Sequence, residues 1–192
     1  MPGSEREVNS DQYYGATARQ YERMRQKTEL WLAEQAVITE WVTQGPVLDV
    51  PVGTGRFIPH YLSRGIDFIG VDISPDMLSQ AAEKDPYAPL DRGDILAGLP
   101  FADRAFRTVV CVRLLVWLPP DDMARALAEC LRLGDEVVFS VRVGVEGRHP
   151  RRASLTHSEQ RVLDALGDRP VLERRTLKTS HAGEQQMWRV GQ

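Results

Sequence analysis

The sequence predicts a single α/β domain built on a Rossmann-like, doubly wound sheet of mostly parallel strands. From Gly45 onward, short β-branched runs alternate with stretches of helical periodicity, which is typical of strands joined by crossover helices. In addition, helix start signals come directly after the expected strand ends. The 192 residues suit one compact domain with a substantial core.

Five strands are expected in the first part of the domain and two further β-like runs near its end. The five strands are 47–50, 68–71, 90–92, 108–112 and 136–143, and the two runs are 171–178 and 185–190. Ser74 and Pro75 form a typical helix N-cap with proline at the first helical position, and Pro119 and Pro120 open a second helix similarly. A further helix is expected near 157–166.

The chain divides into an N-terminal arm (1–44), a central core (45–143) and a C-terminal part (144–192). Residues 11–44 are expected to be helical because apolar side chains recur there at intervals of three and four: Leu30, Ala33, Val37, Ile38 and Trp41. The C-terminal part begins with a loop rich in Gly and Arg. The C-terminal part as a whole carries more Lys and Arg than Asp and Glu, and we interpret these basic residues as a solvated face.

Composition indicates a cytoplasmic protein without a membrane segment. A net charge of -3 argues against nonspecific binding to nucleic acid or anionic membranes, since phosphate neutralisation needs excess Lys and Arg. No signal peptide or membrane-spanning run is present. Cys111 and Cys130 do not form a CxxC pair, which predicts reduced, buried thiols and neither a disulfide nor a metal site. The oligomeric state stays open.

The strongest functional signal is the segment VLDVPVGTGRF at 47–57. An apolar strand ends in Asp49, and a Gly-x-Gly turn and a helix follow. Gly53 and Gly55 let a ligand approach the backbone because no Cβ interferes, and the helix N-terminus offers N–H groups to an anionic group. On its own this pattern does not specify a ligand.

Two later carboxylates narrow the ligand to a nucleoside. Asp72 ends the next strand, nineteen residues after Gly53, where it can accept both ribose hydroxyls of an adenosine. Asp94 follows the third strand, where it can accept the adenine amino group while Ile95 contacts the ring. A dinucleotide motif needs a third glycine where this chain has Ile58, which favours a ligand without pyrophosphate.

These segments resemble the class I S-adenosylmethionine-dependent methyltransferases, particularly the ubiquinone/menaquinone-methyltransferase-like branch, over residues 13–143. VLDVPVGTGRF is similar to that family's glycine-rich motif, GVDISPDML to its second-strand acidic motif, GDILAGLPFADRAF to its adenine segment and VVCVRLLVWLPP to its fourth strand. The resemblance implies a seven-stranded sheet with the last strand antiparallel and an N-terminal helical lid. It also implies S-adenosylmethionine as cofactor, S-adenosylhomocysteine as product, and no metal.

The resemblance assigns cofactor-binding roles to residues of the lid and of the strand ends. These residues are Tyr14, Tyr21, Asp49, Pro51, Gly53, Thr54, Gly55, Asp72, Ile73, Met77, Asp94, Ile95, Val112 and Arg113, with Tyr13 as a further lid candidate. In this assignment the glycine turn cradles the methionine part, Asp72 holds the ribose, and Asp94 and Ile95 hold the adenine. Val112 and Arg113 lie beside the methionine amino group.

Catalysis by such a protein depends mainly on alignment and desolvation, because a sulfonium is an activated methyl donor. A general base is optional and helps only certain acceptors. His149 and Tyr21 are the candidates for this role. Arg148 and His157 are further candidates for contact with the acceptor, and Arg113 can clamp a carboxylate of the acceptor or the cofactor.

We therefore expect methyl transfer to a small-molecule acceptor, because the short chain leaves no room for a large inserted substrate domain. One alternative is a non-catalytic S-adenosylmethionine-binding regulatory subunit, and another is a methyltransferase that acts on RNA through its Arg-rich loop. A nicotinamide-dependent oxidoreductase is disfavoured by Ile58 and by the Asp94 segment. Base methylation of nucleic acid is disfavoured because VRLLVWLPP lacks an Asn- or Asp-Pro-Pro-aromatic turn.

Overall fold

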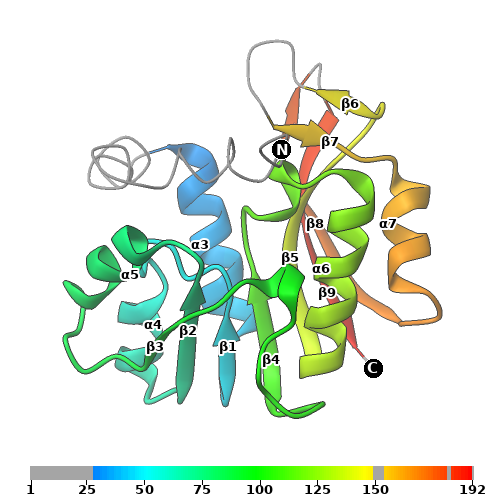
Figure 1. Cartoon of the computed structure of the whole chain (residues 1–192). Helices are drawn as coiled ribbons and strands as arrows, with labels where there is room; N and C mark the ends of the chain where they lie inside the picture. The colour runs from blue at the N-terminus through cyan, green and yellow to red at the C-terminus, as the bar shows by residue number, and fades with distance from the viewer. Residues whose placement is uncertain (1–27, 149–153, 181–182, 192) are drawn as a thin grey trace, which may run out of the picture.

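The computed structural model of the protein describes residues 28–148, 154–180 and 183–191. In this part of the chain, helices cover both faces of a central sheet and produce three layers (Figure 1). The sheet has seven strands in the order β3-β2-β1-β4-β5-β9-β8. They are β1 (Val47–Asp49), β2 (Phe68–Asp72), β3 (Leu90–Arg92), β4 (Phe106–Cys111), β5 (Gly134–Val143), β8 (Val171–Ser180) and β9 (Gly183–Gly191). The predicted doubly wound α/β fold is confirmed.

The strand order reverses at β1, which lies between β2 and β4. Val47 pairs with Phe68 on one side and with Thr108 on the other. Strands β1 to β5 run parallel, whereas β9 is antiparallel to both of its neighbours, β5 and β8. The last strand is therefore antiparallel, as the resemblance implied. Ligands of open α/β sheets bind beyond the carboxyl ends of the strands at such a reversal, so the edge beyond β1 is the expected site.

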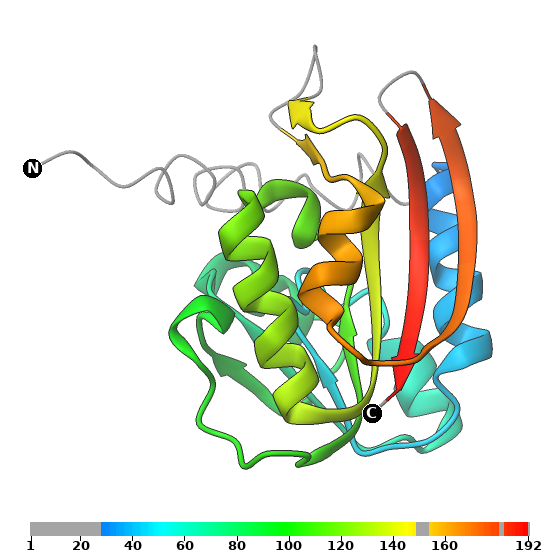
Figure 2. The same cartoon turned by 90° about the vertical axis from the view of Figure 1, so that its right-hand side faces the viewer.

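Five α-helices and two short 3-10 helices lie in the described residues. They are α3 (Glu29–Trp41), α4 (Ile58–Arg64), α5 (Pro75–Ala82), α6 (Pro120–Leu133), α7 (Glu159–Leu166), η2 (Ile95–Ala97) and η3 (Leu115–Trp117). Buried residues of α3, α4 and α5 join one apolar cluster, and those of α6 and α7 join a second. Figure 2 shows α6 and α7 on one side of the sheet and α3 on the other.

The two clusters lie on opposite faces of the sheet because successive strand residues point to opposite sides. Val109 belongs to the α6 and α7 side, and its neighbour Val110 belongs to the α3 and α4 side. Val137 and Val138 of β5 divide in the same way. Continuous apolar runs therefore mark the inner strands, which are buried on both faces.

The predicted helix starts are confirmed. Ser74 is the N-cap of α5, and its side-chain oxygen accepts a hydrogen bond from the N–H of Met77 at 3.2 Å. Helix α6 begins at Pro120, after Pro119 as its N-cap. Helix α5 begins just past the end of β2, as expected, whereas η3 lies between the end of β4 at Cys111 and the start of α6 at Pro120.

Several boundaries differ from the prediction. Strands β4 and β5 each begin two residues earlier than expected, because the parallel ladder already pairs Phe106 with Gly134. The stretch expected to be a loop after β5 contains two short antiparallel strands, β6 (Gly147–Arg148) and β7 (Leu155–Thr156). They lie beyond the carboxyl end of β5, at the top of Figure 1.

Helix α3 is the described portion of the helical arm expected at 11–44, and residues 11–27 lie outside the described residues. Thr28 caps it by accepting a hydrogen bond from the N–H of Trp31 at 3.3 Å. The side chains of Val37, Ile38 and Trp41 are buried in the core cluster on that face. This portion of the expected lid is therefore a layer of the fold.

Cys111 and Cys130 are buried free thiols, as expected. They lie on β4 and α6, within the apolar cluster between the sheet and α6. Within the described residues, no helix has both the length and the apolar character needed to cross a bilayer.

Candidate cofactor-binding site

The glycine turn after β1 gives its two glycines different roles. Gly53 and Gly55 both have positive φ, 56° and 72°. A Cβ on Gly53 would meet no atom within 4 Å, so this side of the turn is open. A Cβ on Gly55 would lie 2.7 Å from Cδ1 of Ile58 and 3.0 Å from Ala81 of α5. Only Gly53 therefore leaves room for a ligand, whereas Gly55 allows close contact between the turn and α5.

The helix after the turn begins later than the motif suggested, because α4 starts at Ile58. The N–H of Gly55 donates to the carbonyl of Val52 at 3.0 Å, and the N–H of Ile58 donates to that of Gly55 at 3.1 Å. The turn is therefore closed by its own backbone before the helix begins. Thr54 is buried within this turn, and Pro51 at its start is half-buried.

Asp72, at the carboxyl end of β2, joins the ends of the first two strands. Its Oδ2 accepts a hydrogen bond from the N–H of Gly53 at 2.9 Å, and its Oδ1 accepts one from the N–H of Ser74 at 2.9 Å. Burial raises the pKa of this carboxyl, and the backbone hydrogen bonds from Ser74 and Gly53 oppose the rise. Each carboxylate oxygen has a second lone pair, so Asp72 can still accept hydroxyl groups of a ligand.

Asp49 lies deeper than Asp72, beneath the glycine turn. It is 1% exposed, and its Oδ2 accepts a hydrogen bond from the hydroxyl of Tyr61 at 3.2 Å. Burial raises its pKa to about 7, while the Tyr61 hydrogen bond and the charge of Arg56 oppose the rise and Asp72 adds to it. This carboxyl is therefore more sensitive to a nearby cation than an exposed aspartate would be.

The expected adenine segment caps a short helix beside α6. Oδ1 of Asp94 accepts a hydrogen bond from the N–H of Leu96 at 2.9 Å, which makes Asp94 the N-cap of η2. Ile95 is buried. Arg132 of α6 donates to the carbonyls of Leu99 and Phe101 at 3.1 and 2.8 Å, so α6 holds the chain that follows η2.

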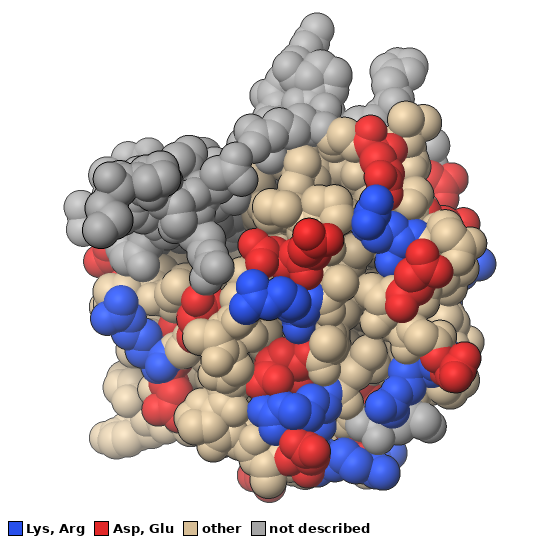
Figure 3. Space-filling model, turned by 45° about the vertical axis from the view of Figure 1, so that its right-hand side comes forward, with Lys and Arg blue, Asp and Glu red and all other residues tan. Residues whose placement is uncertain are grey.

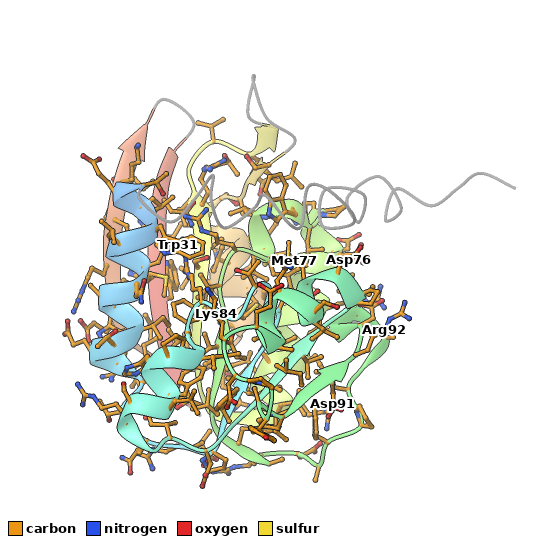
Figure 4. The ribbon with its side chains drawn as sticks, turned by 90° about the vertical axis from the view of Figure 1, so that its left-hand side faces the viewer. Trp31, Asp76, Met77, Lys84, Asp91 and Arg92 are labelled. Atoms are coloured by element: carbon orange, nitrogen blue, oxygen red, sulfur yellow. The ribbon has the colours of Figure 1, made fainter. Side chains whose placement is uncertain are left out.

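Two apolar residues expected at the site differ in exposure. Ile73, directly after Asp72, is 44% exposed and so presents an apolar surface beside this carboxylate. Met77 is buried in α5. Met77 and Trp31 of α3 are labelled in Figure 4, which looks onto the side of the molecule formed by α3, α4 and α5.

The carboxyl end of β4 holds Arg113 in an unusual conformation. Val112 is buried, and Arg113 has a φ of 65°, which L-residues seldom adopt. The N–H of Arg113 donates to Oγ of Ser140 at 2.7 Å. Its side-chain Nε donates to Oε2 of Glu34 at 2.7 Å. The carboxylate that Arg113 clamps here is thus one of the protein's own.

Sequence reasoning missed Glu34, which is fully buried and also accepts a hydrogen bond from Nη2 of Arg56 at 3.0 Å. The guanidinium of Arg56 in turn lies 4.3 Å from the ring centre of Trp31. A signal was available, because Glu34 is four residues after Leu30 and three before Val37 and so lies on the apolar stripe. An acidic residue on such a stripe needs a buried partner.

The two histidines in the described part of the chain bind backbone carbonyls. His157 is buried and its Nε2 lies 3.0 Å from the carbonyl oxygen of Leu115, with its pKa lowered by burial. Nε2 of His60 lies 2.7 Å from the carbonyl oxygen of Val42. Both histidines therefore have structural hydrogen bonds.

Other candidates are not placed by the structure. Tyr13, Tyr14, Tyr21 and His149 lie outside the described residues. For Arg148, the structure gives the backbone, which is part of β6. Within the ranges given above, no three His, Cys, Asp or Glu side chains are grouped so that they could hold a metal ion.

Residues 47–135 match the model of a family described as "Methyltransferase domain". The 18S rRNA (guanine-N(7))-methyltransferase of Bos taurus is 32% identical over 72 residues, which cover 38% of this chain and 26% of that protein. A probable methyltransferase, ltbC, of Aspergillus luteorubrus is 34% identical over 101 residues, which cover 45% of this chain and 35% of the ltbC chain. The chain thus spans only about a quarter to a third of these relatives.

Similar folds occur in solved methyltransferase structures. Magnesium protoporphyrin IX methyltransferase from Synechocystis PCC 6803, with bound SAH, has a TM-score of 0.79 at 16% identity. The similarity covers 98% of this chain and 100% of that enzyme's chain. The 1,6-didemethyltoxoflavin-N1-methyltransferase of Burkholderia thailandensis has a TM-score of 0.68 at 16% identity, covering 100% and 92%. Residues 47–135 of this chain are therefore similar to a methyltransferase domain, and its fold is that of solved S-adenosylmethionine-dependent methyltransferases.

Proposed function

We propose that this chain binds S-adenosylmethionine and transfers its methyl group to a small-molecule acceptor, releasing S-adenosylhomocysteine. The observation that carries the proposal is the contact between the glycine turn and the end of β2. The N–H of Gly53 donates a hydrogen bond to the carboxylate of Asp72, and the space that a Cβ of Gly53 would occupy is open. They meet where the strand order reverses, and such an edge binds ligands in open α/β sheets.

The residues at this edge suit the parts of an adenosyl cofactor. Asp72 keeps acceptor capacity for ribose hydroxyls, and the exposed side chain of Ile73 beside it offers an apolar surface for a purine. Asp94 and the buried Ile95 follow on the neighbouring β3 side. Ile58 occupies the position of a dinucleotide motif's third glycine and is buried in the core, which supports a cofactor without pyrophosphate.

Binding and orientation are the main contributions that the described residues make to the chemistry. The cofactor supplies a methyl group activated by a sulfonium. Gly53, Asp72 and Asp94 would hold it, and Asp49 would place a buried carboxyl near a cationic ligand. Because His60 and His157 bind backbone carbonyls, alignment and exclusion of water carry the reaction in this proposal. His149 and Tyr21 stay our candidates for a general base.

We infer that the acceptor is a small molecule and that the N-terminal lid and the loop 144–154 supply much of the specificity for it. The names of two similar structures specify small molecules, magnesium protoporphyrin IX and 1,6-didemethyltoxoflavin. On the face shown in Figure 3, basic and acidic side chains are interspersed. In the C-terminal part, ion pairs such as Arg161 with Glu146 offset opposite charges. That pattern suits a small acceptor better than an extended phosphate backbone.

RNA is the second candidate acceptor, because two of the similar curated proteins methylate 18S rRNA. The finer assignment to the ubiquinone/menaquinone-methyltransferase-like branch rests on the four motifs quoted above. A cytoplasmic location is supported by the two free, buried thiols.

Isothermal titration with S-adenosylmethionine, S-adenosylhomocysteine and NAD tests cofactor binding. We expect the first two to bind, NAD not to bind, and Asp72→Ala to abolish binding. Asp91→Ala, on the exposed neighbouring strand β3, is the matched control and should bind normally. Binding of NAD alone, or of none of the three, would contradict the proposal.

Transfer of a radiolabelled methyl group then tests the acceptor. The full chain is incubated with labelled S-adenosylmethionine and with separate pools of small carboxylic acids, phenols, heterocyclic amines and total RNA. Label in a small-molecule pool supports the proposal, whereas label in RNA alone supports the second candidate. Cofactor binding without label in any pool would favour the regulatory subunit.

A further inference from the structure

The backbone at Arg113 is the feature of the site that the proposed function does not explain. Arg113 has a φ of 65°, and Arg104 is the other non-glycine residue with positive φ in the described ranges. Such a conformation is unfavourable for a residue with a Cβ, so it persists only when neighbouring contacts hold it. Arg113 comes directly after Val112, at the carboxyl end of β4, where the site lies.

Two buried side chains hold Arg113 from opposite directions. Ser140 of β5 is fully buried, and its Oγ accepts the backbone N–H of Arg113 at 2.7 Å. Glu34 of α3 is also fully buried, and its Oε2 accepts from Nε of Arg113 at 2.7 Å. The backbone is thus fixed by the neighbouring strand and the side chain by the first described helix.

Glu34 also connects this strand end to the glycine turn. Its Oε2 accepts from Nη2 of Arg56 at 3.0 Å, and Arg56 follows Gly53 by three residues. One carboxylate therefore joins α3, the turn after β1 and the end of β4. A buried charge in such a cluster is costly to leave unpaired, so the three elements are held in one arrangement.

We propose that Glu34 and Ser140 are positioning residues that hold Arg113, and with it the end of β4, in the geometry that receives the methionine part of the cofactor. This inference rests on the proposed function, in which Val112 and Arg113 lie beside the methionine amino group. Glu34 and Ser140 both act through Arg113, which the proposed function places beside the methionine part and not beside the adenosine.

Paired titrations with two ligands test this inference. S-adenosylhomocysteine keeps the amino and carboxyl groups of the methionine part, whereas 5′-methylthioadenosine carries the same adenosine and sulfur without them. We expect Glu34→Gln and Ser140→Ala each to weaken binding of S-adenosylhomocysteine about tenfold, as for the loss of one charged or buried hydrogen bond. Binding of 5′-methylthioadenosine should change less than about twofold, within ordinary surface-mutation effects.

Two matched controls show whether the effect belongs to these positions. Glu40 lies on the same helix and forms an ion pair with Arg175, so Glu40→Gln breaks a Glu–Arg pair away from Arg113. Thr108 is a buried hydroxyl residue toward the amino end of β4, which makes Thr108→Val the control for Ser140→Ala. Both controls should bind the two ligands as the unmodified protein does.

The Arg113→Gly background tests whether Glu34 acts through Arg113. Glycine adopts positive φ without a Cβ penalty, so the backbone conformation stays accessible while the guanidinium is lost. In this background, Glu34→Gln should not change the ratio of the two affinities further. Arg104→Gly, at the other positive-φ position, should leave both affinities unchanged.

The outcomes separate this inference from the proposed function. If Glu34→Gln and Ser140→Ala weaken both ligands equally, or neither ligand, the inference is wrong while cofactor binding stands. A tenfold effect of Glu34→Gln that persists in the Arg113→Gly background also overturns it for Glu34. If the unmodified protein binds neither ligand, the proposed function fails, and this inference fails with it. Ser140→Ala keeps the test decisive if Glu34→Gln does not fold.

Discussion

The N–H of Gly53 donates to Oδ2 of Asp72 at 2.9 Å, although nineteen residues separate them in the sequence. The bond fixes the glycine turn against the end of β2. This hydrogen bond uses one lone pair of the Asp72 carboxylate, and the same carboxylate is proposed to accept the ribose hydroxyls of the cofactor. The stability of the turn and the binding of the ribose thus share one side chain.

Asp72→Asn is expected to weaken S-adenosylhomocysteine binding by about tenfold to a hundredfold, because charge-assisted hydrogen bonds are worth about 1.5–3 kcal/mol. The fold should survive with a modest loss of stability, since the amide oxygen can still accept the N–H of Gly53, whereas the amide nitrogen is a donor and cannot replace the bond from the N–H of Ser74. Isothermal titration measures the affinity, and Asp91→Asn on β3 serves as the control. An unchanged affinity would exclude Asp72 from the ribose site.

Replacing each glycine of the turn by alanine should have different effects: mainly on cofactor affinity at Gly53 and mainly on stability at Gly55. Gly53→Ala is expected to reduce cofactor affinity with a stability loss of about 1 kcal/mol, because its Cβ points into open space at positive φ. Gly55→Ala is expected to destabilise the fold by about 3 kcal/mol or more, because its Cβ would collide with Ile58 and Ala81. Thermal unfolding and titration together distinguish the two effects, and equal unfolding temperatures would count against this assignment.

The buried carboxyl of Asp49 should make stability depend on pH. Its pKa rises from 3.8 to about 7 on folding, so the folded state binds a proton that the unfolded state releases. Its contribution is therefore fully present below about pH 4 and is lost as the pH rises through about 7. At about 1.36 kcal/mol per pKa unit, the loss amounts to about 4 kcal/mol.

Asp49→Asn should remove this dependence. The variant should unfold at nearly the same denaturant concentration as the unmodified protein near pH 4, and should be more stable by a few kcal/mol near pH 8. Asparagine can still accept the hydrogen bond from Tyr61, so the contact is preserved. Urea titrations at both pH values measure the difference. Parallel pH profiles for the two proteins would show that Asp49 does not titrate in this range.

Arg132 should support the adenine segment from α6. It donates to the carbonyls of Leu99 and Phe101 and pairs with Glu129, which itself accepts the N–H of Leu99 at 2.7 Å. Arg132→Met is expected to weaken S-adenosylhomocysteine binding about threefold to tenfold, because the segment after Asp94 loses these anchors. Arg104→Met, which breaks the exposed pair with Asp135, is the control. If both variants bind alike, α6 does not position this segment.

Much of the fold was predictable because it follows from local chemistry. The predicted strands correspond to every strand of the seven-stranded sheet, and the start signals at Ser74 and Pro119 placed the starts of α5 and α6. The short hairpin of β6 and β7 was not predicted, because its two-residue strands carry no periodic signal. The glycine turn and the carboxylates at the ends of β2 and β3 could be named as candidates from the sequence because their spacing along the chain reflects the order of the strands.

The sequence by itself determined the order of the seven main strands along the chain and the chemical types of the residues near their carboxyl ends. Only the tertiary structure decided that Gly55 serves contact with α5, that His157 binds a carbonyl, and that Glu34 meets Arg113. Glu34 and Arg113 are 79 residues apart, and no periodicity along one helix or strand encodes such a pair. They meet because α3 packs against the sheet on the face that also receives the glycine turn, and burial of a charge then requires a partner from another element.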